Sequence, residues 1–152
     1  FSFGIIIVVI GVTLRSVRFG LISVIPNVVP FLLAYGVLSI FTKVVTFSHT
    51  VAILIAIGLV VDATIHFLTK FKKANSMNLS PYDAIQYCYK YVGYPIIVAS
   101  VCLFSGFLFL VQSSFQTNYV LGGMCALIIL LALVIDLLLL PSLLLIFGNK
   151  SK

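Results

Sequence analysis

The stretch YVLGGMCALIILLALVIDLLLLPSLLLIF, residues 119–147, decides the class of fold. It is apolar nearly throughout, and Asp136 is its only charged residue. About 20 mostly apolar residues are enough for an α-helix to cross the hydrocarbon core of a bilayer, and this stretch is longer than that. Because an unpaired backbone group is costly in lipid, and because the apolar residues run continuously rather than in alternation, we predict a transmembrane helix.

The composition of the whole chain agrees with a membrane protein. Of the 152 residues, 62% are hydrophobic and 8% are charged, whereas a water-soluble domain carries roughly 25% charged residues. The chain therefore has too few charges to cover the surface of a soluble fold. Because it begins at Phe1 rather than at Met, we expect it to be the tail of a longer protein.

Further apolar runs precede residues 119–147, and each is predicted to span the bilayer. Residues 1–14 are not interpreted as a signal peptide, because Arg15 and Arg18 come after the apolar run and not before it. The predicted fold class is an all-α integral membrane protein with five transmembrane helices. The predicted spans are residues 1–14, 19–41, 49–71, 94–111 and 119–147.

The basic residues predict the topology, because positive charges favour the cytoplasmic side of a membrane protein. If the connection after the first span is cytoplasmic, Lys43 is the only Lys or Arg residue on the extracytoplasmic side. The chain is then a multi-pass protein of the cell membrane, with its N-terminal end extracytoplasmic and its C-terminus cytoplasmic. The net charge of +6 follows this topology and does not indicate nucleic-acid binding. The basic residues on the cytoplasmic side are Arg15, Arg18, Lys70, Lys72, Lys73, Lys90, Lys150 and Lys152.

Residues 81–92 are predicted to form a short amphipathic helix on the cytoplasmic surface of the membrane. Ser80, Pro81 and Asp83 are typical of a cap, a first-turn proline and a third-position acid, and Gly93 is expected to end the helix. We interpret it as an anchoring connector, with a partner-binding site as the alternative. Its apolar face consists of Ala84, Ile85, Cys88 and Val92.

Asp62 lies inside the predicted span 49–71. A carboxylate at the centre of a span costs roughly 2.5–3.5 kcal/mol, so it is expected to face protein or water. Gly58, Asp62 and His66 are spaced by four and share a helix face, on which Gly58 would permit close approach of a neighbouring helix. A proton relay through Asp62 and His66 is one interpretation. The alternatives are a simple interhelical hydrogen bond for Asp62 and a solvated His66.

Asp136 also lies inside a predicted span, and Pro141 follows it. Proline removes a backbone donor, so Pro141 should kink the helix or free a carbonyl. A relay or gating role and a helix-packing role are both open for Asp136. In the span 19–41, Pro26 and Pro30 remove two donors and predict a bend, where the side chain of Asn27 can satisfy a group left open.

Nothing in the sequence indicates an enzyme. It contains no Ser/His/Asp set, no metal-ligand spacing and no Gly-rich phosphate loop, so we expect no cofactor and no metal. Cys88, Cys102 and Cys125 have no pairing motif and are expected to be small packing residues. His49, at the outer end of the span 49–71, is expected to be solvated.

Four segments in order resemble the resistance-nodulation-division superfamily, in particular its MMPL-type branch of lipid and hydrophobe exporters. IPNVVPFLLAYGVL (25–38) resembles a Pro-Asn-x-x-Pro span, and AIGLVVDATIHFLTKFKK (56–73) resembles a Gly-x-x-x-Asp-x-x-Ile-His-Phe span. SGFLFLVQSSFQTN (105–118) resembles the Gly-Phe end of a span and the short outer loop that follows it. LALVIDLLLLPSLL (131–144) resembles the final span. The resemblance covers nearly the whole chain.

The resemblance implies two repeats of six spans, of which this chain would supply spans eight to twelve. The N-terminal half of the same transporter would then be a partner, beside the lipid bilayer and a possible second copy. In this family, acids in the fourth and tenth spans carry protons, and Asp62 matches the tenth-span position. The family often has a second acid or a tyrosine next to it, where this chain has Ala63.

We therefore expect a transporter that exports lipid or another hydrophobic molecule, with protons as the coupling ion. A non-transporting, sterol-sensing-like module that responds to lipid is the first alternative, since it needs no titrating residue. A structural or assembly subunit of a membrane complex is the second alternative.

Overall fold

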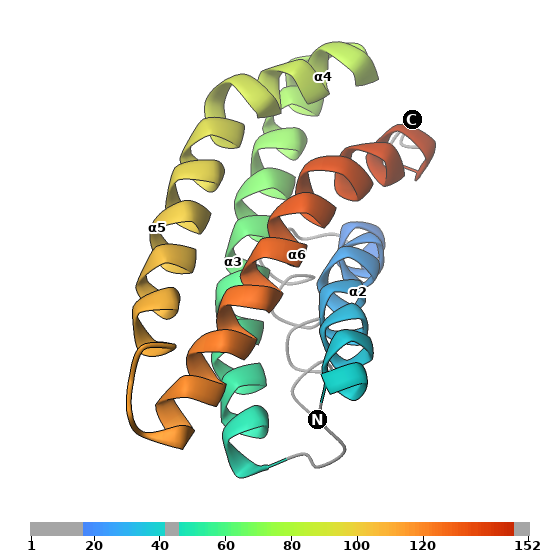
Figure 1. Cartoon of the computed structure of the whole chain (residues 1–152). Coiled ribbons are helices and arrows are strands. Elements are labelled where there is room, and N and C mark those ends of the chain that lie inside the picture. The colour runs from blue at the N-terminus through green and yellow to red at the C-terminus, as the bar shows by residue number, and fades with distance from the viewer. Residues whose placement is uncertain (1–16, 42–45, 148–152) are drawn as a thin grey trace.

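A computed structural model describes residues 17–41 and 46–147, and the elements in these ranges are helical (Figure 1). The predicted span 1–14 lies outside the described residues, as do Arg15, Lys43, Lys150 and Lys152. In chain order the elements are α2 (Val17–Phe41), α3 (Phe47–Ser76), α4 (Pro81–Cys88), the π-helical turn η1 (Tyr89–Gly93), α5 (Tyr94–Leu110) and α6 (Gln116–Phe147).

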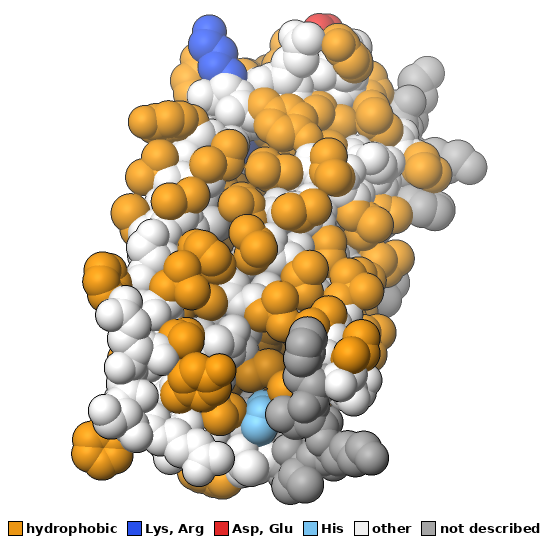
Figure 2. Space-filling model, viewed as in Figure 1, with side chains coloured by type: hydrophobic (Ala, Val, Ile, Leu, Met, Phe, Trp, Pro, Cys, Tyr) orange, Lys and Arg blue, Asp and Glu red, His pale blue; other side chains and the backbone are white. Residues whose placement is uncertain are grey.

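The described part of the chain contains four helical stretches that are long and apolar enough to cross a membrane. They are Ile22–Ile40, Phe47–Ser76, Pro81–Leu110 and Gln116–Ile146. On the face shown in Figure 2, hydrophobic side chains cover the body of the bundle, and the visible charged side chains gather at the end formed by α4. The all-α membrane fold is confirmed, whereas the count of five spans stays a prediction.

Helix α6 organises the packing of the bundle. It crosses obliquely between its neighbours (Figure 1) and packs against α2, α3 and α5. Small residues permit this close packing: Cys125 of α6 lies with its Sγ 3.5 Å from the Ala52 carbonyl oxygen of α3, and Ala56 of α3 is fully buried. The expected packing role is therefore observed for Cys125, while Cys102 on α5 is exposed.

The start of α3 shows that one prediction was wrong. His49 is only 4% exposed, although we expected it to be solvated. Its Nδ1 accepts a hydrogen bond from the Thr46 backbone N–H at 3.0 Å and lies 2.7 Å from Thr46 Oγ1. The imidazole thus folds back to form a capping box over the first turn, and this buries it.

Helix α4 begins as predicted but does not end as predicted. Ser80 is its N-cap, accepting a hydrogen bond from the Asp83 backbone N–H at 3.2 Å. Gly93 does not stop the helix, because the chain continues through η1 directly into α5. Pro95 offers no amide N–H to the preceding turn, and η1 is a single π-helical turn inserted between two α-helical segments.

The apolar face predicted for residues 81–92 exists, but it packs against protein. Ala84, Ile85, Cys88 and Val92 are all buried, and α4 packs on the end of α3. Cys88 lies with its Sγ 3.9 Å from the Phe67 carbonyl oxygen. Helix α3 extends to Ser76, beyond the predicted end of the span at Phe71, and Ala74 in its last turns is fully buried.

Candidate functional site

The centre of the bundle contains a cluster of buried polar side chains. Asn27 of α2, Thr64 of α3 and Asp136 of α6 are 2%, 0% and 3% exposed, respectively. Thr64 Oγ1 lies 3.2 Å from Asn27 Oδ1 and 3.2 Å from Asp136 Oδ1. One threonine hydroxyl therefore connects three spans.

Asn27 lies between the two prolines of α2. Pro26 and Pro30 lie inside one continuous helix, where each removes a backbone donor. Asn27 Nδ2 donates a hydrogen bond to the Ser23 carbonyl at 2.7 Å. The carbonyls that Pro26 and Pro30 leave open lie four residues earlier, at Ile22 and Pro26, so this bond is not the predicted pairing with an open carbonyl. This bond fixes the orientation of the amide group, so that Oδ1 faces Thr64 as an acceptor.

The number of hydrogens in the cluster depends on the protonation state of Asp136. The Thr64 hydroxyl has one hydrogen, yet it contacts two side-chain oxygens, and the Val60 carbonyl oxygen lies 3.4 Å away. If Asp136 is neutral, its O–H can donate to Thr64 while Thr64 donates to Asn27. If Asp136 is ionised, Thr64 can satisfy only one of the two side chains, and a charge stays in the apolar interior.

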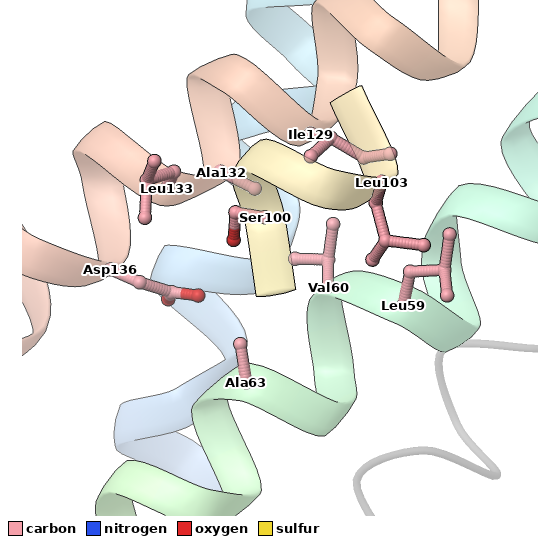
Figure 3. A pocket seen from close by; sticks show the side chains of 9 residues that line it. All are labelled: Leu59, Val60, Ala63, Ser100, Leu103, Ile129, Ala132, Leu133 and Asp136. Carbon is pink, nitrogen blue, oxygen red and sulfur yellow. The ribbon is translucent and has the colours of Figure 1, made fainter. Parts of the chain in front are cut away.

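A small cavity lies beside Asp136, between α3, α5 and α6. It has a volume of about 20 Å³. Figure 3 shows the carboxyl of Asp136 and the hydroxyl of Ser100 turned toward the space that Ala63 borders from below. The remaining wall is apolar and includes Val60, Leu103 and Ala132. Asp136 therefore contacts the Thr64 hydroxyl and also borders a space with a second hydroxyl.

Asp62 and His66 lie on a different face of α3 from this cluster. The Asp62 Oδ1 and His66 Nε2 atoms are 3.5 Å apart, which confirms that the two residues share a helix face. Their side chains are 72% and 67% exposed. The structure therefore does not bring Asp62 together with Asp136: the first acid lies on the open side of the bundle and the second lies inside it.

Gly58 belongs to the same open face of α3. No described residue comes within 4 Å of the position that a Cβ would occupy there. The predicted close approach of a helix at Gly58 is therefore not made by α2, α4, α5 or α6, and packing by another part of the protein stays a prediction.

Sequence reasoning did not identify Thr64 or Ser100. A signal for Thr64 was present, because it falls on the same stripe as Ala56, Ile57, Val60 and Phe67, all of which are buried. A hydroxyl on the buried stripe of a transmembrane helix points toward other helices and seeks a partner there. Ser100 carries no comparable signal, since α5 buries little of its surface.

The described residues contain no group of three or more His, Cys, Asp or Glu side chains that could hold a metal ion. In the Asn27–Thr64–Asp136 cluster, oxygen atoms of three spans lie within hydrogen-bonding distance of one hydroxyl. Their arrangement suits the transfer or storage of a proton.

Comparison with known proteins identifies the family. The family model described as the MMPL family matches residues 1–152, the whole length of the chain. No curated protein and no solved structure matches it. A match over the whole chain, together with an all-helical bundle able to span a membrane, shows that the chain belongs to the MMPL family, a family of membrane transporters.

Proposed function

We propose that the chain is part of a transporter that uses the proton motive force to export lipid or another hydrophobic molecule. The observation that carries this proposal is the buried Asn27–Thr64–Asp136 cluster, in which the hydrogen bonds between three spans depend on one proton. A carboxyl group that served only as a packing residue would be replaceable by any neutral group of similar size.

Protonation changes the connection between the helices. With Asp136 neutral, hydrogen bonds run from Asp136 to Thr64 and from Thr64 to Asn27, joining α6, α3 and α2. Loss of the proton removes one of these bonds and leaves a charge that the interior cannot solvate. The three helices can then lower the free energy by moving apart enough to admit water, and this movement would be transmitted to the parts of the transporter that handle substrate.

Asp62 and His66 would supply a second place for the proton. They form an i,i+4 pair on the open face of α3, and we propose that the N-terminal half of the transporter packs on this face. That half would cover the pair and complete the path to the extracytoplasmic side.

The proton motive force is sufficient to export a molecule against a concentration gradient. One elementary charge that crosses a potential of 100 mV releases ~2.3 kcal/mol. This free energy supports a concentration ratio of roughly fifty-fold per charge.

The experiment uses the full-length transporter in proteoliposomes that contain a fluorescently labelled phospholipid as probe, with an imposed proton gradient. Asp136→Asn retains the shape and removes the titration, so it should abolish the part of probe movement that a protonophore also abolishes. Asp62→Asn should reduce the same component. Probe movement at the normal rate in Asp136→Asn would disprove the role of the cluster. Indifference of the unmodified protein to the protonophore would favour the lipid-responsive module instead.

A further inference from the structure

The cavity beside Asp136 has the size and the wall that a single water molecule requires. A space of roughly 10–15 Å³ can hold a water, provided that two or more polar groups bind it. This cavity measures about 20 Å³. Its polar side chains are Ser100 and Asp136, and Figure 3 shows that their oxygens face the same space.

The Asp136 carboxyl group has two neighbours. Its Oδ1 lies 3.2 Å from Thr64 Oγ1, and the group also borders the cavity. Ala63 borders the cavity with only a methyl group, and a larger side chain at this position would fill it. The space thus depends on a small residue of α3 and on a hydroxyl of α5.

We propose that this cavity binds one water molecule between Ser100 Oγ and the Asp136 carboxyl group, and that the proton of Asp136 is exchanged through this water. The inference rests on the proposed function, because it requires Asp136 to gain and lose a proton. Ser100 is a positioning residue: it holds the water and does not itself titrate.

The transfer needs no group besides water. The O–H bond of the neutral carboxyl breaks, the carboxylate keeps the electron pair, and the bound water becomes hydronium. The hydronium then passes one of its protons to a second water molecule that enters at the open side of the cavity. Uptake of a proton follows the same steps in reverse.

No other titratable side chain among the described residues lines the cavity. On the helices that pack against α6, Tyr35 of α2, Asp62 and His66 of α3 and Cys102 of α5 are all exposed. The Tyr89 hydroxyl of η1 bonds the Leu137 carbonyl. Proton exchange at Asp136 is therefore expected to depend on the cavity water and not on a neighbouring side chain.

The test measures hydrogen–deuterium exchange of the Asp136 carboxyl in the full-length transporter by infrared spectroscopy. The carbonyl band of a protonated carboxyl shifts on deuteration, and its loss in Asp136→Asn identifies the band. Ala63→Val fills the cavity and should slow the exchange by about tenfold or more. Ser100→Ala removes one partner of the water and should slow it by roughly threefold to tenfold. Ser100→Ala also serves as the informative variant if Ala63→Val does not fold.

Ser105→Ala is the matched control on the same helix. Ser105 is exposed, and its hydroxyl donates to the Val101 carbonyl of its own helix at 2.8 Å, so exchange at Asp136 should keep its normal rate. Exchange at the normal rate in both Ala63→Val and Ser100→Ala would overturn the water site while leaving the proposed function intact. If no carbonyl band at any pH from acid to alkaline is lost in Asp136→Asn, the carboxyl group never holds a proton. Both the water site and the proposed function then fail.

Discussion

The Tyr89 hydroxyl in η1 donates a hydrogen bond to the Leu137 carbonyl in α6. Leu137 lies four residues before Pro141, so in a regular helix the amide of residue 141 would be the donor to this carbonyl. Proline has no amide N–H, and Tyr89 supplies the missing donor from another span. The sequence predicted that Pro141 would free a carbonyl, and the structure shows which side chain satisfies it.

Tyr89→Phe should therefore destabilise the protein, because it leaves the Leu137 carbonyl without its donor. The expected loss in the free energy of unfolding is about 1 kcal/mol, at the low end for an unsatisfied acceptor because Tyr89 is partly exposed. The midpoint of thermal unfolding of the full-length protein in detergent measures this loss. Tyr82→Phe is the control, since Tyr82 is 65% exposed, and it should leave the midpoint unchanged.

A double-mutant cycle of Tyr89 and Pro141 tests whether the Tyr89 hydroxyl stabilises the protein through the Leu137 carbonyl. Pro141→Ala restores a backbone N–H that can bond the Leu137 carbonyl, so Tyr89→Phe should cost little in that background. An equal loss with and without Pro141→Ala would mean that the Tyr89 hydroxyl does not act through this carbonyl.

The apolar runs predicted the fold because each span must bury an apolar surface and pair its own backbone. The cap at Ser80 and the face formed by Ala84 and Cys88 were also predictable, since both depend on residues close in sequence. The continuation of the helix through Gly93 was not, because packing of α4 on α3 overrides the local tendency of glycine to end a helix. Local signals thus predicted the helices and the start of α4, whereas the continuation past Gly93 depends on tertiary contacts.

The candidate site was predictable only in part. The cost of a charge in lipid singled out Asp62 and Asp136 alike, because the sequence does not tell which face of a span meets another helix. Only the packing of α2, α3 and α6 distinguishes the buried Asp136 from the exposed Asp62. Thr64 and Ser100 were missed, because hydroxyl side chains are common in transmembrane helices. Their role depends on which side chains of other helices lie beside them, and the sequence does not show this.

Gly122 and Gly123 form a matched pair on α6. A Cβ at Gly122 would lie 2.6 Å from the Phe107 carbonyl oxygen and 2.7 Å from Leu110 Cβ, whereas nothing lies within 4 Å of a Cβ at Gly123. Gly122→Ala should force α5 and α6 apart and destabilise the protein by about 1–3 kcal/mol. Gly123→Ala should be neutral or stabilising by up to about 1 kcal/mol.

Thermal unfolding of the two glycine variants in parallel provides the measurement. Equal midpoints for Gly122→Ala and Gly123→Ala would show that α5 and α6 do not approach as closely as the structure indicates.

Thr64→Val should weaken the junction of three spans, because it removes the hydroxyl while keeping the size of the side chain. Asn27 Oδ1 and Asp136 Oδ1 then lose a shared partner, and the expected cost is about 1–3 kcal/mol. Thr64→Ser keeps the hydroxyl and should retain most of the stability. Thermal unfolding distinguishes the two outcomes, and a loss as large in Thr64→Ser as in Thr64→Val would assign the effect to packing instead.

Thr69→Val is the control for the removal of a threonine hydroxyl from α3. Thr69 is exposed, and its hydroxyl donates to the Ile65 carbonyl of its own helix at 2.7 Å. Its replacement should change the free energy of unfolding by less than about 0.5 kcal/mol.

Asp62→Asn should separate stability from transport. Asp62 is 72% exposed, and its Oδ1 lies 3.5 Å from His66 Nε2. Exposed pairs of this kind contribute little to stability, so the unfolding midpoint of this helix bundle should not change. If the face of Gly58, Asp62 and His66 carries protons where it meets the N-terminal half, the same substitution should nevertheless reduce protonophore-sensitive movement of the labelled phospholipid.

Asp136→Asn, inside the bundle, should instead alter both the unfolding midpoint and the protonophore-sensitive movement, since it changes the hydrogens of the buried cluster. A loss of stability in Asp62→Asn as large as that in Asp136→Asn would mean that Asp62 is buried by a structural contact, and its assignment to the proton path would fail.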